Sequence, residues 1–341
     1  METLNYIGSK KSLIENIKMI CSENIPDLQN NTFADLFSGT GTVGFNMNGL
    51  CKSIIGNDLE YYSYVINYAL LLSSYSSKLQ NIIDNMNDLD MVEDGLIFTN
   101  YSKDRLFFTH DNAKKADAIR QYLDTITNID EKEYMFLLAS IIVSIDKVAN
   151  TSVVYGAFLK EYKKAALKPL IIKPIHMNKK NNKNNKVYNM MMEELIVGKS
   201  FDIVYLDPPY NHRQYSANYS PLNYIAHYED IELTGKTGLI KDYNKSNFCK
   251  KTNIKETFTD SINNINCKYL ILSYNNEGLM SFDDLKEILL KKGDIKLYKI
   301  KYNKFKAQQN VNGDKVFEYL WFVDTNMKTN KFEEIETELI K

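Results

Sequence analysis

The chain has 341 residues, of which 44% are hydrophobic and 25% charged, and its formal net charge is −1. This length and apolar content suit a globular protein with a sizeable core, built as one large domain or two. A net charge so close to zero excludes any argument from overall charge for a nucleic-acid partner, and the longest apolar stretch, 136–145, is far shorter than the roughly 18 residues of a membrane span.

The sequence also bounds the compartment and the metal content. The N-terminus, M-E-T-L-N-Y, lacks the basic segment and apolar run of a secretory signal. The four cysteines, Cys21, Cys51, Cys249 and Cys267, show no C-x-x-C spacing, and the four histidines complete no metal-binding set. We therefore expect a reduced cytoplasmic protein that binds neither a metal nor a membrane.

The first sixty residues predict an α/β unit. Apolar side chains at Leu13, Ile14, Ile17 and Ile20 have helical spacing and predict a helix over 9–21. Strands are predicted at 32–37 and 53–57, with a glycine-rich turn at 38–44 and a helix from 42 towards 50 between them. At the start of the chain, G-S-K (8–10) either holds a carboxylate ligand, through backbone N–H groups and Lys10, or simply begins the helix.

The glycine-rich turn contains G-x-G-x-x-G, within D-L-F-S-G-T-G-T-V-G (35–44). Its glycines allow positive φ and a close approach of the backbone to a ligand. Asp58 lies nineteen residues past Gly39 and is placed to accept hydrogen bonds from ribose hydroxyls. Taken alone, this pair fits a nicotinamide cofactor as well as it fits S-adenosylmethionine.

The middle of the chain, 61–186, predicts a helical insertion. Helical patterns are clearest at 62–79, 112–126 and 131–148, and the segment 178–186 is an Asn/Lys-rich loop of low complexity. Nine lysines against one acid, Glu161, lie between Lys160 and Val187, and five lysines against Asp242 lie between Lys241 and Lys255. Such blocks form either solvated faces or contacts to phosphate.

Strands resume after the insertion, at 186–188, 201–206, 268–273, 295–302 and 316–323. We interpret the chain as one sheet interrupted by helices, with a discontinuous catalytic domain formed by 1–60 and 187–341. The predicted fold class is α/β, with a Rossmann-like sheet.

The strand at 201–206 runs directly into Asp207, Pro208, Pro209 and Tyr210, the motif D-P-P-Y. Two prolines cannot donate to a sheet ladder, so the strand must end there, at the edge where ligands of open α/β sheets bind. Asp207 and the Pro208 carbonyl suit the two hydrogens of a planar exocyclic amine, and Tyr210 suits stacking on its ring, which is worth roughly 1–3 kcal/mol per base. The alternative is a Pro-Pro turn with a surface tyrosine.

In their order along the chain, these segments resemble the Dam-like, alpha-class N6-adenine-specific DNA methyltransferases, a group that includes many type II restriction-modification methylases. The resemblance rests on Y-I-G-S-K-K-S-L (6–13), the glycine turn, Asn57-Asp58, D-P-P-Y and Y-S-P-L-N-Y-I-A (219–226), and it covers the two ends of the chain, about two-thirds of its length. It implies a Rossmann-like S-adenosylmethionine-dependent methyltransferase sheet, with target recognition in the helical insertion 61–186.

The same resemblance implies a role for individual residues. Tyr6 and Lys10 would contact the methionine part of S-adenosylmethionine, and Asp58 its ribose. The remaining cofactor residues would be Asp35, Phe37, Gly39, Gly41, Asp207 and Asn189, the last standing where relatives often carry an acid. Asp207, Pro208, Pro209 and Tyr210 would form the catalytic site, without a metal.

For the substrate, the resemblance implies a short site in double-stranded DNA, with the adenine flipped out of the helix and methylated by direct in-line transfer. The residues predicted to contact DNA are Lys179, Lys180, Lys183, Arg213, Gln214 and Tyr215. A restriction endonuclease acting on the same site is an expected partner, and the cytoplasm of a bacterium, or of the host of a phage or virus, is the expected compartment.

Three alternatives stand beside this hypothesis. An adenine in RNA offers the same amine, and a nicotinamide-dependent oxidoreductase would use the glycine turn and Asp58. A DNA-binding protein that keeps the fold without catalysis would have no use for an aspartate that polarises an amine, so the intact D-P-P-Y argues against it.

Overall fold

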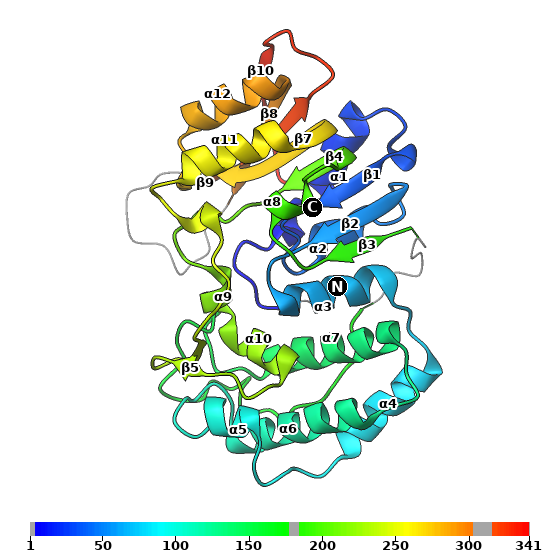
Figure 1. The fold of residues 1–341 in the computed structure, drawn as a ribbon, viewed down its shortest axis with the longest axis vertical. Helices are drawn as coiled ribbons and strands as arrows, with labels where there is room; N and C mark the ends of the chain where they lie inside the picture. The colour runs from blue at the N-terminus through cyan, green and yellow to red at the C-terminus, as the bar shows by residue number, and fades with distance from the viewer. Residues whose placement is uncertain (1–3, 177–183, 303–315, 341) are drawn as a thin grey trace.

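The computed structural model describes residues 4–176, 184–302 and 316–340, and in this part of the chain an eight-stranded sheet forms the centre (Figure 1). Its strand order is β10-β8-β9-β7-β4-β1-β2-β3. The bounds are β1 Thr32–Asp35, β2 Ser53–Asn57, β3 Lys186–Tyr188, β4 Ser200–Leu206, β7 Asn266–Asn275, β8 Asp294–Tyr302, β9 Val316–Asp324 and β10 Phe332–Thr337. A two-stranded ribbon joins β5, Leu233–Thr234, to β6, Leu239–Ile240.

Five neighbouring strands, β7-β4-β1-β2-β3, run parallel, whereas β9 is antiparallel to both β7 and β8. The carboxyl ends of the five parallel strands therefore meet along one edge. Side chains on successive strand positions point to opposite faces, and both faces are buried. On β4, Ile203 and Tyr205 pack into one core, while Val204 and Leu206 pack into the other. The expected α/β fold is confirmed.

Helices cover both faces of the sheet. One core packs under α8, Met192–Leu195, α11, Ile254–Asn264, and α12, Phe282–Lys292. The other lies under α1, Ile14–Asn24, α2, Thr42–Met47, and α3, Tyr61–Leu72. The 3-10 turns η1 Lys10–Leu13, η2 Leu28–Asn30 and η3 Asn247–Cys249 and the short helix α9 Tyr215–Asn218 complete this part.

A helical region lies below the sheet in the view of Figure 1 and continues from α3. It comprises α4 Ser77–Asp88, α5 Leu96–Tyr101, α6 His110–Thr125 and α7 Glu131–Lys147. A later segment, α10 Ser220–His227, also packs here, since Arg120 Nε on α6 donates to the Ile225 carbonyl at 3.0 Å. The helical part of the protein thus draws on residues from both sides of β4.

Two element predictions were wrong in detail, and one strand was missed. The single helix expected over 62–79 is two helices, because the polar run 73–76 breaks it and the Ser76 hydroxyl caps α4 by accepting from Leu79 N. The first strand ends at Asp35 rather than at residue 37, and β10 was not predicted. Of the Asn/Lys-rich segment, 177–183 lies outside the described residues.

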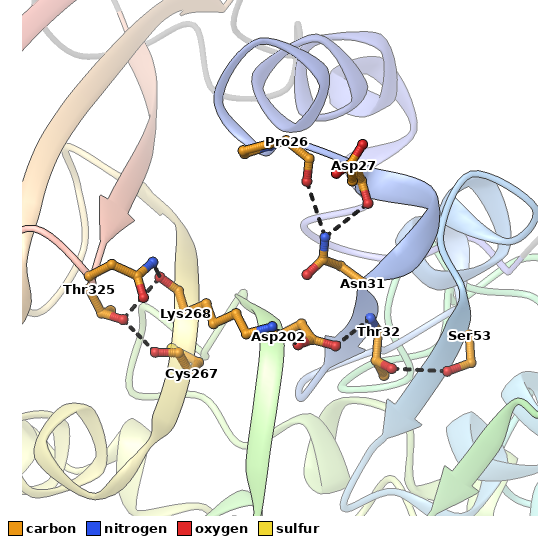
Figure 2. A network of polar contacts seen from close by, with 10 residues as sticks. Pro26, Asp27, Asn31, Thr32, Ser53, Asp202, Cys267, Lys268 and Thr325 are labelled. Atoms are coloured by element: carbon orange, nitrogen blue, oxygen red, sulfur yellow. Dashed lines mark hydrogen bonds and ion pairs between the residues drawn. The ribbon is translucent and has the colours of Figure 1, made fainter.

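The amino ends of the parallel strands are joined by polar contacts (Figure 2). Asp202, near the start of β4, accepts from the backbone N–H of Thr32 at 2.9 Å and forms an ion pair with Lys268 of β7 at 2.7 Å. The Thr32 and Ser53 hydroxyls share a hydrogen bond of 3.2 Å. These contacts tie β1, β2, β4 and β7 together at the edge opposite to D-P-P-Y.

No helix of the described residues is long and apolar enough to cross a membrane.

Candidate active site

A pocket lies at the carboxyl ends of β1, β2 and β4, and it is closed on one side by the N-terminal segment. Its lining combines the glycine turn, the residues after β2 and β3, and the D-P-P-Y corner. The predicted site residues that line it are Tyr6, Lys10, Asp35, Phe37, Gly39, Asp58, Asp207, Pro209, Gln214 and Tyr215. Segments more than 150 residues apart in sequence thus meet where an α/β sheet binds its ligand.

The glycine turn has the backbone geometry that its sequence predicts. Gly39 and Gly41 have φ values of 48° and 74°, the left-handed region that other residues avoid. A Cβ on Gly39 would lie 3.1 Å from the Tyr6 ring, so the space above this residue is narrow. The Gly39 N–H donates to Asp58 Oδ2 at 2.7 Å, which fixes the acid beside the turn. Burial raises the pKa of Asp58 to about 6.

Several buried polar atoms of the pocket lining have no hydrogen-bond partner within the described residues, among them the acceptors Asp35 Oδ1 and Asn57 Oδ1. Buried polar atoms are normally paired, so a ligand with N–H or O–H donors is expected to satisfy them. Burial, and then the charge of Asp207, holds the pKa of Asp35 well above its usual range. S-adenosylmethionine carries hydrogen-bond donors, an ammonium group and ribose hydroxyls, so it fits a pocket lined by unpaired acceptors.

The N-terminal segment is held against the pocket by the helical region. The Tyr6 ring stacks on Tyr219 with the centroids 4.7 Å apart, and the Tyr219 hydroxyl accepts from the Ile7 N–H at 2.8 Å. The Asn5 N–H donates to Asp146 Oδ2 at 2.8 Å, at the end of α7. The wall that carries Tyr6 and Lys10 therefore depends on residues far along the chain.

Lys10 is 5% exposed and lies between two carboxylates. Its Nζ is 3.0 Å from Asp207 Oδ1 and 3.3 Å from Glu318 Oε1, and it also donates to the Gly8 carbonyl. The Asp207 side chain is 18% exposed. Burial raises the pKa of Asp207 to about 6, against the opposing effect of Lys10.

The rest of the D-P-P-Y corner is built around this pair. Pro209 lines the pocket, and Pro208 is buried between it and Asp207. The Tyr210 ring lies 5.5 Å from Lys10 Nζ and packs edge-on against Tyr274 at 6.1 Å. The Leu279 N–H donates to the Tyr210 carbonyl, which fixes the backbone after the two prolines. Of the four motif residues, Asp207 and Pro209 line the pocket, whereas Pro208 and Tyr210 lie next to it in the chain without lining it.

Asn189 and Gly41 support the pocket without lining it. The Asn189 amide donates to the carbonyls of Asp58 and Leu59, at 2.8 and 3.0 Å. The lining itself continues from Met190 to Glu193. A Cβ on Gly41 would lie 2.9 Å from Asn67 Oδ1, so this glycine permits close packing of α2 on α3.

The residues predicted to contact DNA have different surroundings. Arg213 is exposed. Gln214 is used within the protein, because its amide both donates to and accepts from the backbone of Ser246. Tyr215 faces Tyr6 with the centroids 5.4 Å apart. Lys179, Lys180 and Lys183 lie outside the described residues.

Two site residues, Glu60 and Glu318, were missed by sequence reasoning. Glu60 lies two residues after Asp58 and accepts hydrogen bonds from Ser216 and Asn223, which follow D-P-P-Y. Burial raises its pKa to about 7. Its position in N-D-L-E is a signal that could have been used, whereas no local pattern marks Glu318. Among the described residues, no group of three His, Cys, Asp or Glu side chains could hold a metal, and all four cysteines are buried thiols.

Comparisons with known proteins agree on one family. The profile of the D12 class N6 adenine-specific DNA methyltransferases matches residues 6–288. The chain is similar to the type II methyltransferase M.NlaIII of Neisseria lactamica, with 41% identity over 94% of this chain and 99% of that one. It is also similar to the type II methyltransferase M.CviAII of Paramecium bursaria Chlorella virus 1, with 40% identity over 95% and 99%.

Among solved structures, the chain is similar to a Listeria monocytogenes protein described as a candidate class I S-adenosylmethionine-dependent methyltransferase. That likeness has 11% identity and a TM-score of 0.41, over 98% of this chain and 66% of that one. The family profile and the two type II relatives confirm the resemblance inferred from the motifs. The chain belongs to the D12 class N6 adenine-specific DNA methyltransferases, and S-adenosylmethionine is its methyl donor.

Proposed function

We propose that the D-P-P-Y corner methylates N6 of an adenine that is rotated out of a short duplex site. The observation that carries this proposal is the position of Asp207, which directly follows β4, lines the same pocket as the glycine turn and keeps its side chain 18% exposed. An amine inside a duplex cannot reach a buried cofactor, so the base must leave the stack.

The role of each motif residue follows from the chemistry of the amine. Its lone pair is delocalised into the ring, so N6 is a poor nucleophile until its hydrogens are held. Asp207 and the Pro208 carbonyl each accept one hydrogen, and positive charge developing on N6 is stabilised by the carboxylate. Since Asp207 Oδ1 faces Lys10, we assign Oδ2 to the amine. Tyr210 stacks on the adenine.

The cofactor is held by the residues that line the inner pocket. When bound, S-adenosylmethionine would supply the methyl group from its sulfonium centre; the S–CH3 bond would break as the N6–CH3 bond forms, with S-adenosylhomocysteine as the leaving group, and the methylated amine would release one proton to solvent. Asp58 and the glycine turn take the ribose, and Asp35 takes an N–H or O–H donor through its unpartnered Oδ1. Tyr6 covers this part of the pocket. The ammonium group of Lys10 already contacts the carboxylates of Asp207 and Glu318, and these contacts limit how close it could come to the carboxylate of a bound methionine moiety.

Target recognition is proposed for the helical region within 61–186. Exposed lysines follow α7 at Lys160, Lys164, Lys168 and Lys173, in a stretch with a strong excess of positive charge. Lys179, Lys180 and Lys183 extend it in sequence. Each phosphate contact that is lost should reduce the slope of log K against log salt by about 0.9. Unchanged slopes after replacing these three lysines would leave them as solvated residues.

The biological setting is proposed from the relatives. The type II relatives come from a bacterium and from a chlorella virus. We therefore propose action in the cytoplasm of a bacterium or of a virus host, beside a restriction endonuclease that cuts the same site. No stable complex with that endonuclease is implied.

The test compares matched DNA and RNA duplexes in one transfer assay with tritiated S-adenosylmethionine. After digestion to nucleosides, the label should appear in N6-methyldeoxyadenosine. Label in N6-methyladenosine from RNA, with none from DNA, would favour the RNA alternative. Calorimetric cofactor binding by protein that transfers no label to either duplex would contradict the proposed mechanism.

A further inference from the structure

The buried ion pair at the catalytic aspartate raises an electrostatic problem. Asp207 is assigned to stabilise positive charge on N6, yet Lys10 Nζ lies only 3.0 Å from its Oδ1. A carboxylate paired with a buried ammonium forms a neutral unit, which attracts a developing cation much less than a free carboxylate does. Asp207 and Lys10 alone would therefore be a weak site for this chemistry.

Glu318 supplies the missing charge. Its Oε1 is 3.3 Å from Lys10 Nζ, so the cluster of two carboxylates and one ammonium carries a net charge of −1 when all three are ionised. Glu318 is 8% exposed and lies on β9, opposite Asn275 in the β7–β9 register. The Ser273 hydroxyl donates to the same Oε1 at 2.8 Å. The carboxylate is thus fixed on the sheet, beside the reacting edge.

We propose that Glu318 is a positioning residue for methyl transfer. It holds Lys10 through a second carboxylate contact to the ammonium group and restores the negative charge that Asp207 needs. This inference rests on the proposed function, because it concerns the same amine. A purely structural role, as an anchor between β9 and β7 through Ser273, is the competing explanation.

The titration of Asp207 provides a readout that separates the two explanations. The titratable groups near Asp207 are Lys10 of η1, Asp35 at the end of β1, Tyr205 of β4, Tyr215 of α9 and Glu318 of β9, and the Tyr210 ring lies beside Lys10. Burial raises the pKa of Asp207 to about 6, Lys10 lowers it, and Glu318 raises it. Removal of the Glu318 charge should therefore lower the pKa of Asp207.

The experiment uses Glu318→Gln, which keeps the size of the side chain and an acceptor for Ser273. The control is Glu336→Gln, which removes an exposed carboxylate from the edge strand β10. Single-turnover methyl transfer to DNA should fall at least about tenfold in Glu318→Gln. The acid limb of the pH–rate profile of Glu318→Gln should move to lower pH. The affinity for S-adenosylmethionine, measured by calorimetry, and the melting temperature should stay close to those of the control.

A second measurement needs no turnover. With 13C-labelled aspartate carboxyls, and with Asp207→Asn to assign the signal, the pKa of Asp207 in the cofactor-free protein should be lower in Glu318→Gln than in the wild type. An unchanged pKa with an unchanged transfer rate would overturn the inference and leave the proposed function intact. Failure of the wild-type protein to transfer a methyl group to adenine would instead overturn the proposed function.

Discussion

Two aspartates lie at the two ends of β4, Asp202 near its amino end and Asp207 directly after its last residue, and their surroundings are opposite. At the amino edge, Asp202 is partly buried, which raises its pKa, but contacts from Lys268 and the Thr32 N–H outweigh this, and the pKa is lowered (Figure 2). At the carboxyl edge, burial raises the pKa of Asp207 to about 6 despite its contact with Lys10.

This difference in pKa indicates that Asp202 stabilises the sheet, whereas Asp207 belongs to a functional site. Asp202 joins neighbouring strands, and its contacts favour the ionised carboxylate. Because the folded state lowers the pKa of this group, its ionisation contributes to stability at neutral pH. The carboxyl edge instead keeps unpartnered acceptors at Asp35 and Asn57 and places charged groups where folding gains little from them. Such groups persist at sites that need them for a ligand, because perturbed pKa values cluster at functional sites.

The largest expected effect is that of Asp207→Asn compared with Asp202→Asn. Asp207→Asn should reduce methyl transfer by roughly 10³-fold, because the amine loses its charged acceptor, while cofactor affinity falls more modestly. Asp202→Asn should leave transfer unchanged. A tritium-transfer assay beside calorimetry measures both, and equal losses of transfer in the two variants would abolish the distinction between the edges.

The second prediction concerns the glycine turn. Gly39→Ala places a Cβ 3.1 Å from the Tyr6 ring at a φ of 48°, so S-adenosylmethionine affinity should fall about tenfold. The matched control is Gly198→Ala, which has a φ of 67° and nothing within 4 Å of the added Cβ. It shares the backbone strain but lies outside the pocket lining. Equal affinities in the two variants would argue against a cofactor above Gly39.

The third prediction is a loss of stability at the amino edge. Asp202→Asn weakens the hydrogen bond from the Thr32 N–H, which should lower the free energy of unfolding by about 0.5–1.5 kcal/mol at pH 7.5, whereas the exposed ion pair with Lys268 is screened by solvent and adds little. Urea unfolding measures this value. Stability equal to that of the wild type would show that the network of Figure 2 is not needed to hold β1 and β4 together.

The smallest effect is a dependence on pH with opposite signs for stability and activity. Asp207 and Asp58 have pKa values of about 6 in the folded protein, above those in the unfolded chain. At a pH between the unfolded and the folded pKa values, the folded protein therefore binds more protons than the unfolded chain does. Their contribution to stability should therefore increase as pH falls from 7.5 to 5, while transfer declines as Asp207 is protonated. Asp207→Asn should show a weaker increase in urea-unfolding stability over this range than the wild type, and an equal increase would contradict the assigned pKa.

The sequence predicted those parts of the site that are local. D-P-P-Y and the glycine turn each specify a backbone shape within a few residues, and the positive φ of Gly39 and Gly41 follows from it. The strand into Asp207 was visible because a strand buried on both faces has a continuous apolar run.

The rest of the site depends on contacts between distant residues. Glu60 is held by Ser216, 156 positions away, and Asn5 by Asp146, 141 positions away. Glu318 lies on an antiparallel strand whose order in the sheet no local pattern reveals. The break between α3 and α4 was missed because helical spacing of apolar residues continued across a polar run whose Ser76 acts as a cap.

The central claim is that the carboxyl edge methylates adenine through Asp207, and its most direct test is single-molecule sequencing of DNA. A host free of DNA methylation should express either the wild-type chain or Asp207→Asn. The account predicts modified adenines within one short motif for the wild type and none for the variant. The account would be contradicted if host DNA carried no modified adenines although the wild-type protein is folded and binds the cofactor. It would also be contradicted if Asp207→Asn modified the same motif as the wild type.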